Sequence, residues 1–275
     1  MRTYKLVDND GNTYDITAKE KAFFYNVSGL GYEREIDTQR IEDRYAVLSD
    51  KLAQIIIEGT LRFVKPGAEE EYFKFAQFSQ NAPITLLYNP GHGEYYRKGL
   101  ISKIERNDGP DILTIKVSFK PTTPWIKDLN VNNDGQIVGG KVYDYEYDYT
   151  YSDSVEGSII LTSDSYLSSP CKLTIYGEVV NPIWRHYVEN KLVTIGQINA
   201  TIPINHKLVI DTTVIPYSIK EYDMANQLIA DRYQNSDFST NRFVRIERGE
   251  NVISAAGDGG ASALKVEAQI EYATV

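Results

Sequence analysis

Residues 143–151 read Tyr-Asp-Tyr-Glu-Tyr-Asp-Tyr-Thr-Tyr, with tyrosine at every odd position and a polar residue at every even one. Successive side chains of a strand point to opposite faces, so this unbroken period of two predicts a β-strand with one packed and one solvated face. Just before it, Asn130–Gly135 and Gly139-Gly140 form the most turn-prone stretch of the chain. The strand therefore opens a second unit, and the residues upstream should form a separate one.

The polar face of this strand carries Asp144, Glu146 and Asp148. Same-face neighbours lie about 7 Å apart along a strand, a spacing that also suits the paired carboxylates of a glycoside hydrolase. A solvated face is the commoner use of alternating charges, and it is the reading we favour.

Composition sets the class of protein. The chain has 275 residues, 42% hydrophobic and 24% charged, with 21 Tyr. This is enough for two domains, and the tyrosine content leans toward β structure. The net charge of −9, without a Lys/Arg-rich run, argues against a nucleic-acid-binding surface.

The remaining global features concern location and redox state. The single cysteine, Cys171, cannot form an intrachain disulfide and is expected to be a packed small residue. The start, Met1–Lys5, has no apolar signal-peptide region, and no run is long enough to span a membrane. We expect synthesis in the cytoplasm, with no export signal and no membrane partner.

In the first domain, residues 1–126, the patterns predict β-strands and one α-helix. Gln54–Val64 is expected to be the central strand, with Gly59 leaving room for a close neighbour. Glu69–Glu71 begin a helix whose apolar stripe includes Tyr72 and Phe75. The returning strand Ile112–Lys120 alternates cleanly between apolar and polar residues.

Two polar stretches are harder to place. Ser28–Asp50 is predicted as weak strands or an extended arm, which either settles on a neighbouring chain or is a surface loop. Pro121–Trp125 should force the chain out of the sheet. Residues 127–140 are then a linker.

The second domain, residues 141–275, is predicted to be a two-sheet β-sandwich or jelly roll, because short β-branched segments recur at near-regular spacing. A short helical turn is expected within Glu221–Asp231. The expected strands, in addition to the tyrosine strand, are Gly157–Thr162, Leu173–Val179, Lys191–Ile195, Lys207–Val214, Phe243–Ile246 and Ala263–Ala273.

No catalytic constellation is visible. His92, His186 and His206 lie in separate segments without metal-ligand spacing, and neither a phosphate-binding loop nor a Gly-x-Ser-x-Gly motif occurs. We read His186 as structural or interfacial. The sequence thus predicts no enzyme, no cofactor and no metal, and it leaves ligand-binding residues unknown.

Several stretches in succession resemble one family, the distal tail proteins of bacteriophages with long, non-contractile tails. They are Ile57–Phe63, Tyr96–Ile101 leading to Phe119 and Thr123-Pro124-Trp125, and, toward the C-terminus, Ser169–Gly177, Asn181-Pro182-x-Trp184, Leu208–Asp211 and Phe243–Asn251. No single motif is specific, but their order is.

The resemblance implies a mainly β protein with two domains: an N-terminal β-sandwich or split-barrel-like domain with one helix, and a C-terminal galectin-like β-sandwich. It implies a non-enzymatic baseplate hub at the phage tail tip, where a hexameric ring joins the tail tube protein to the tail-associated fibre or lysin protein and, in some members, to receptor-binding proteins. DNA would pass through its channel without specific binding, and acidic residues of the first domain are candidates for the channel lining: Glu33, Glu35, Asp37, Glu42 and Asp43.

Two other functions stay open. A stand-alone carbohydrate-binding module would use the tyrosines to stack on sugar rings, and a glycoside hydrolase would use the strand-face acids. The helix-bearing first domain and the missing export signal count against the carbohydrate-binding module.

Overall fold

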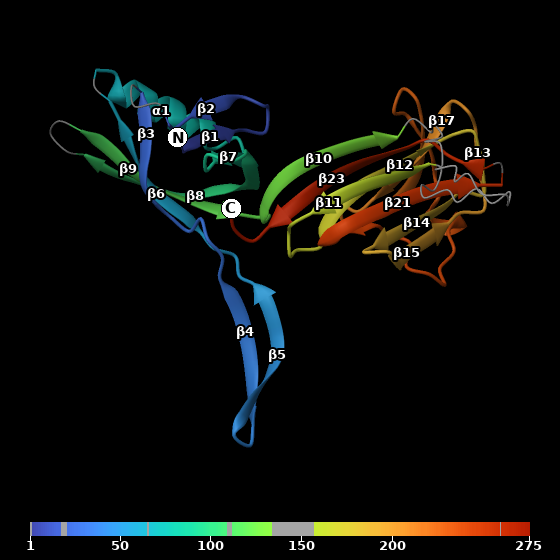
Figure 1. Cartoon of the computed structure of the whole chain (residues 1–275). Helices are drawn as coiled ribbons and strands as arrows, with labels where there is room; N and C mark the ends of the chain where they lie inside the picture. Colours follow the sequence, from blue (N-terminus) through green and yellow to red (C-terminus); the bar gives the residue numbers. More distant parts are fainter. Residues whose placement is uncertain (1, 18–20, 65, 109–111, 134–156, 259) are drawn as a thin grey trace, which may run out of the picture. The chain divides into compact units, whose positions relative to one another are not determined.

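The computed structural model describes residues 2–17, 21–64, 66–108, 112–133, 157–258 and 260–275. Figure 1 shows a mainly β chain, as predicted, and it divides into two compact units: Met1–Lys127 with Tyr272–Val275, and Asp128–Glu271. The tyrosine strand predicted over 143–151, with its three acids, lies outside the described residues.

The described residues of the first unit form one helix and a set of strands. Their bounds are β1 Thr3–Val7, β2 Thr13–Asp15, β3 Ala22–Ser28, β4 Arg34–Ile41, β5 Arg44–Leu52, β6 Ile57–Phe63, α1 Ala68–Phe78, β7 Ile84–Asn89, β8 Tyr95–Asp108, β9 Leu113–Pro121 and the start of β10, Trp125–Asn133.

The predicted central strand is confirmed. β6 pairs on one side with β3 and on the other with β9, and Ile57, Leu61 and Phe63 are buried. A Cβ added to Gly59 would stand 2.4 Å from the ring of Phe24, so the glycine makes room for an aromatic side chain of β3. The alternation of apolar residues on β9 is likewise buried, as its period predicts.

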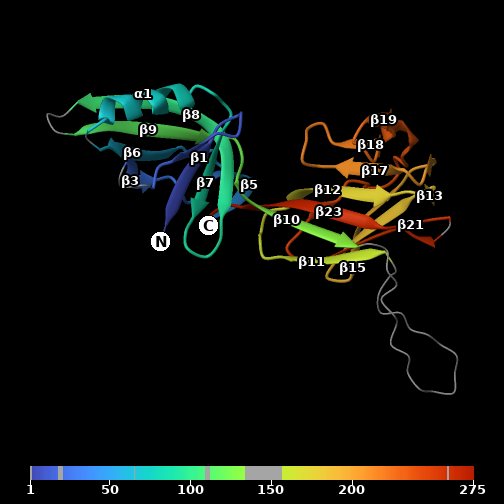
Figure 2. The same ribbon diagram turned by 90° about the horizontal axis from the view of Figure 1, so that it is seen from above.

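Helix α1 covers this sheet (Figure 2). The ring of Phe75 lies 6.1 Å from that of Phe63 on β6 and 5.4 Å from that of Tyr14 on β2. The stripe at helical spacing therefore packs the core, since aromatic pairs at these distances add to area burial.

The sheet of the first unit has an open strand order, β3-β6-β9-β8-β7-β1-β2, and among the described residues no strand pairing joins β2 to β3. Ile16, just after β2, links the two ends: its N–H donates to the carbonyl of Tyr4 on β1 at 3.2 Å, and its carbonyl accepts the N–H of Phe24 on β3 at 2.9 Å. Tyr4 also lies edge-on to Phe24 at 5.7 Å. A few backbone hydrogen bonds and aromatic packing, rather than a continuous ladder, therefore hold these ends together.

The predicted linker is also corrected. Residues 127–133 belong to β10, and 134–140 lie outside the described residues. The Pro121–Pro124 turn lets the chain re-enter the sheet, because Trp125 is fully buried, donates its indole N–H to the carbonyl of Leu30 at 3.1 Å, and is followed by Ile126 paired with Tyr96. Burial of a whole indole outweighs the break that the prolines impose. The last residues, 272–275, return to the first unit.

The second unit is built from two antiparallel sheets, one ordered β19-β18-β17-β12-β23-β10 and the other β11-β21-β14-β15 (Figures 1 and 2). Its other elements are β11 Ser158–Ser163, β12 Ser169–Tyr176, β13 Val179–Val180, β14 Ile183–Val188, β15 Lys191–Gln197, β16 Thr201–Ile202, β17 His206–Asp211, β18 Ser218–Asp223, β19 Leu228–Asp231, the 3₁₀ turn η1 Tyr233–Asn235, β20 Arg245–Ile246, β21 Gly249–Gly257, β22 Gly260–Ala261 and β23 Leu264–Tyr272.

Both sheets contribute side chains to the core of this unit. Leu173 and Val266 of one sheet and Trp184 and Ile253 of the other are fully buried. The helical turn expected within Glu221–Asp231 was wrong: this stretch is the end of β18, a turn and β19, held by cross-strand pairing. In the described part of the chain, no helix is long and apolar enough to cross a membrane.

Candidate functional site

The three histidines occupy unrelated places. His92 lies exposed in the loop before β8, His186 is fully buried on β14, and His206 begins β17. Among the described residues, no group of three or more His, Cys, Asp or Glu side chains gathers in a way that could hold a metal ion.

His186 is a structural residue between β14 and β21. Its Nε2 lies 2.9 Å from Oδ1 of Asn251, whose own amide nitrogen donates to the backbone carbonyls of Glu247 and Gly249. Because these bonds fix the amide orientation, Nε2 must be the donor. Burial lowers the pKa of His186, so the ring is neutral.

Cys171 is packed, as expected from the sequence. Its thiol donates to the carbonyl of Val244 at 3.4 Å, and its N–H donates to Oγ1 of Thr212 at 2.8 Å. Desolvation raises the pKa of the thiol to about 12, so the thiolate needed for nucleophilic chemistry does not form near neutral pH.

One buried acid in the second unit is neutralised locally. Glu221 of β18 is buried beneath His206 of β17 and Arg232, which follows β19; Nε of Arg232 donates to its carboxylate at 2.7 Å. Desolvation alone would raise the pKa of Glu221, but hydrogen bonds from His206 and Arg232 hold it below its usual value. This cluster ties three adjacent strands together.

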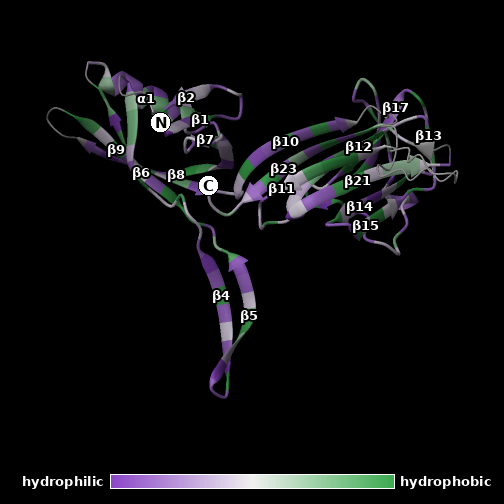
Figure 3. Ribbon diagram, in the orientation of Figure 1, coloured by the Kyte–Doolittle hydropathy of each residue, from purple (hydrophilic) through white to green (hydrophobic). Residues whose placement is uncertain are grey.

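Most of the stretch with an ambiguous prediction, Ser28–Asp50, lies in a long hairpin formed by β4 and β5, Arg34–Leu52. β4 and β5 pair only with each other, and the residues of β4 are all exposed. Its colouring in Figure 3 is mainly hydrophilic, interrupted by separate apolar positions. An isolated two-stranded hairpin is only marginally stable in water. The exposure of both faces of this hairpin therefore needs an explanation.

The register assigns most of the large apolar side chains to one face. Ile36 pairs with Asp50, Thr38 with Val47, and Arg40 with Tyr45, and directly paired residues point to the same side. Ile36, Tyr45 and Val47 are each more than half exposed, and Leu52, paired with Arg34, continues their row toward the base of the hairpin. We call this row, Ile36, Tyr45, Val47 and Leu52, the apolar face of the hairpin.

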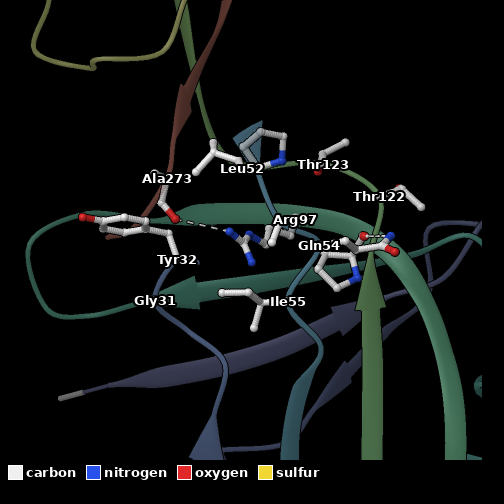
Figure 4. A pocket seen from close by; sticks show the side chains of 12 residues that line it. Gly31, Tyr32, Leu52, Gln54, Ile55, Arg97, Thr122, Thr123 and Ala273 are labelled. Carbon is white, nitrogen blue, oxygen red and sulfur yellow. Dashed lines mark hydrogen bonds between the residues drawn. The ribbon is translucent and has the colours of Figure 1, made fainter. Parts of the chain in front are cut away.

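A cavity of about 190 Å³ opens at the base of the same hairpin (Figure 4). Its walls come from the residues that lead into β4, those that follow β5, the turn between β9 and β10, Arg97 of β8 and the backbone near the C-terminus. The lining residues are Gly31, Tyr32, Leu52, Ala53, Gln54, Ile55, Arg97, Pro121, Thr122, Thr123, Pro124 and Ala273.

Arg97 is the charged residue of this cavity. It is only 6% exposed, and its guanidinium stacks 4.7 Å from the centre of the Trp125 ring. One nitrogen donates a long bond, 3.4 Å, to the carbonyl of Ala273, while Nε has no acceptor among the described residues. Desolvation lowers the pKa of Arg97 to about 10.

Comparison with protein families places the first unit. Residues 3–122 match the model described as "Distal tail protein, N-terminal domain". The first unit of the chain is therefore a domain of the distal tail protein family. The resemblance found in the sequence is thereby confirmed.

Solved structures agree with the fold of the whole chain. It is similar to a chain of the activated phage P2 baseplate with Ca, at a TM-score of 0.62 and 16% identity over 100% of both chains. It is also similar to the Dit protein of phage SPP1, at a TM-score of 0.67 and 8% identity over 96% of this chain and 98% of the other. Comparison with curated proteins gives no match.

Sequence reasoning missed Arg97 as a functional candidate, although a signal was present. Tyr95, Arg97 and Gly99 alternate along β8 in the inward register: Tyr95 and Arg97 are buried, and an added Cβ on Gly99 would meet the backbone of Lys120 at 2.4 Å. An arginine at an inward strand position needs an anionic or hydrogen-bonding partner, which either its own chain or a bound ligand supplies.

Proposed function

We propose that this protein is a structural hub of the phage tail tip, part of the virion baseplate, and has no enzymatic activity. Six copies form a ring that joins the tail tube protein to the tail-associated fibre or lysin protein, and peripheral adsorption proteins attach around it. The second unit acts as a galectin-like sandwich on the outside of the ring. The observation that carries this proposal is the match of residues 3–122 to the N-terminal domain of distal tail proteins.

The β4–β5 hairpin supports assembly. Its apolar face would expose side chains such as Ile36, Tyr45 and Val47 to water in a monomer, each with more than half of its surface accessible. Burying such rows yields about 25 cal/mol per Å² of apolar area, and exposed strand edges accept further pairing. The hairpin is therefore the segment that we assign to the contact between neighbouring copies.

Charge is compatible with passage of DNA through the ring. Six copies at −9 each give −54, and DNA-binding surfaces instead gather Lys and Arg to release counterions. The acidic residues considered for the channel lining are all exposed and lie on the hairpin or immediately before it: Glu33, Glu35, Asp37, Glu42 and Asp43.

The test is the mass of the purified protein in solution, measured by light scattering over a concentration series, with images of the particles. A species of six chains is expected. Val47→Asp, on the apolar face, should reduce assembly at least tenfold, whereas Gln39→Asp, on the opposite face of the same hairpin, should leave it unchanged. A strictly monomeric protein at every concentration contradicts the ring.

A second candidate function, carbohydrate binding, has one specific observation in its favour. Tyr217, Tyr233 and Phe243 line an open groove of the second unit together with Asp231 and Lys220, and aromatic rings with polar neighbours are the usual walls of ligand sites. Calorimetry with host cell-wall polysaccharide tests it. Polysaccharide binding should be lost in Tyr217→Ala and kept in Tyr166→Ala, which changes an exposed tyrosine outside the groove. That pair of results would establish this function.

A further inference from the structure

The cavity at the base of the hairpin contains the positive charge of Arg97 but no negatively charged lining residue. None of the 12 residues that line it is acidic. Glu33 follows the lining residue Tyr32, but it is exposed, and no ion pair joins a described carboxylate to Arg97. A buried guanidinium with a free donor is costly unless an anion meets it.

Three other polar side chains of the cavity are already engaged. Thr122 donates its hydroxyl to the carbonyl of Lys98 at 3.0 Å, and the Thr123 hydroxyl accepts the N–H of Lys98, also at 3.0 Å. Gln54 donates its side-chain amide to the carbonyl of Pro121 at 2.7 Å. Arg97 is the charged group of the cavity, and its Nε is a donor left for a ligand.

The chemistry of the walls selects the kind of anion. A single guanidinium offers a planar pair of donors that matches one carboxylate, and Leu52, Ile55, Pro121 and Pro124 supply apolar surroundings. A phosphate dianion needs more than one cation or a set of backbone N–H groups. The site therefore fits a monoanionic carboxylate.

Size and position indicate where that carboxylate comes from. The volume of about 190 Å³ holds about six waters at 30 Å³ each and is smaller than the 300–1,000 Å³ typical of free small-molecule sites. Leu52 belongs both to the cavity wall and to the apolar face of the hairpin. A chain lying on that face would reach the cavity with a side chain.

We propose that the Arg97 cavity binds a single carboxylate, presented as an Asp or Glu side chain by another protein chain. The bound acid touches both ends of the hairpin, since Tyr32 precedes β4 and Leu52 ends β5. Binding thereby couples the orientation of the hairpin to the presence of its neighbour. The chemistry of the cavity does not depend on the number of copies in the ring.

The experiment follows the Nε–Hε signal of Arg97 by NMR in the full chain labelled with ¹⁵N-arginine, assigned by its loss in Arg97→Lys. Sodium acetate, N-acetyl-aspartate amide and N-acetyl-glutamate amide are added at constant ionic strength, with sodium chloride and phosphate as comparisons. We expect a saturable shift with acetate and with at least one of the two amides, and none with chloride.

Variants supply a second readout. Because the guanidinium stacks on Trp125, carboxylate binding should also change the fluorescence of this residue in a Trp184→Phe background. Arg97→Lys should weaken acetate binding at least fivefold, since an ammonium lacks the planar fork. Arg106→Lys, an arginine on the same strand that stacks on Tyr72 and pairs with Glu69, should not.

A series of protein concentrations identifies the source of the acid. A shift that grows with concentration and disappears in Glu42→Gln/Asp43→Asn assigns it to a second copy; a shift with the added amides alone assigns it to a different protein. The proposal is overturned if acetate acts no differently from chloride, if phosphate binds more tightly than acetate, if acetate binds and neither amide does, or if Glu33→Gln moves the signal without added acid.

Discussion

Replacing Arg97 with methionine should make the isolated protein more stable. The difference between the ordinary arginine pKa of about 12.5 and about 10 in the folded chain, at 1.36 kcal/mol per pKa unit, puts the cost of burying the charge at about 3 kcal/mol. That cost is fully present at neutral pH, because the lowered pKa of this base still leaves it protonated there.

Two contacts offset part of the cost. Stacking on Trp125 returns about 1 kcal/mol, and the long bond to the Ala273 carbonyl about 0.5 kcal/mol. Methionine keeps the apolar stem and the contact with the indole. The expected net gain is about 1.5 kcal/mol in the free energy of unfolding.

Urea unfolding, followed by fluorescence, measures this change. The protein has 2 Trp, one buried in each unit, so a Trp184→Phe background leaves Trp125 to report on the first unit. With a slope of about 2 kcal/mol per M, the midpoint should rise by roughly 0.7 M.

The control is Arg106→Met, which removes an arginine of the same strand from a surface ion pair with Glu69 and should change stability by less than about 0.5 kcal/mol. Loss of more than about 1 kcal/mol in Arg97→Met would refute the reasoning, because it would mean that the guanidinium already has a strong partner. If Arg97→Met is more stable but no longer binds a carboxylate, the variant shows the trade-off between stability and function that is common at binding sites.

Three further outcomes are expected. Gly59→Ala should cost about 1–3 kcal/mol, because its Cβ would meet the Phe24 ring at 2.4 Å, whereas Gly31→Ala, with open space around it, should cost less than about 1 kcal/mol in urea unfolding. Glu221→Gln should lower the stability of the second unit by about 2 kcal/mol at pH 7. Since the pKa of Glu221 is lowered in the folded protein, this loss of stability should be fully present above about pH 4.3 and should shrink as the pH falls through the pKa of the folded state. The fluorescence of Trp184 in the second unit can follow this unfolding. Cys171, buried with its pKa raised to about 12, should resist a thiol reagent in the native protein and react once urea unfolds it; rapid native labelling would contradict its packing.

Where one face of an element is buried, the sequence alone determined it. The alternation of Leu113, Ile115, Val117 and Phe119 fixed both the strand and its inner face, and the stripe around Phe75 fixed the helix. A period of two or of 3.6 leaves only one way to cover the apolar side. The family followed from the order of such segments.

The tertiary structure decided the elements that lack such a period. The hairpin at Arg34–Leu52 has exposed faces, so the sequence predicted only weak strands or an extended arm there, and the register could not be derived from a buried side. Strand β10 forms despite the prolines before it, because Trp125 and Ile126 contact residues that are distant in sequence. Trp125 donates a hydrogen bond to the carbonyl of Leu30, and Ile126 pairs with Tyr96. Propensity acts on neighbours in sequence, and these contacts join residues far apart.

The cavity was also decided mainly by the tertiary structure. The sequence gives the inward register of Arg97, but its burial, its stacking on Trp125 and its missing acceptor arise from chain segments around residues 31, 54, 97, 122 and 273 that meet only in the folded unit. Whether a buried charge has a partner depends on three-dimensional distance, because Coulomb attraction and hydrogen bonding fall off within a few ångströms. No pattern along the chain encodes that distance.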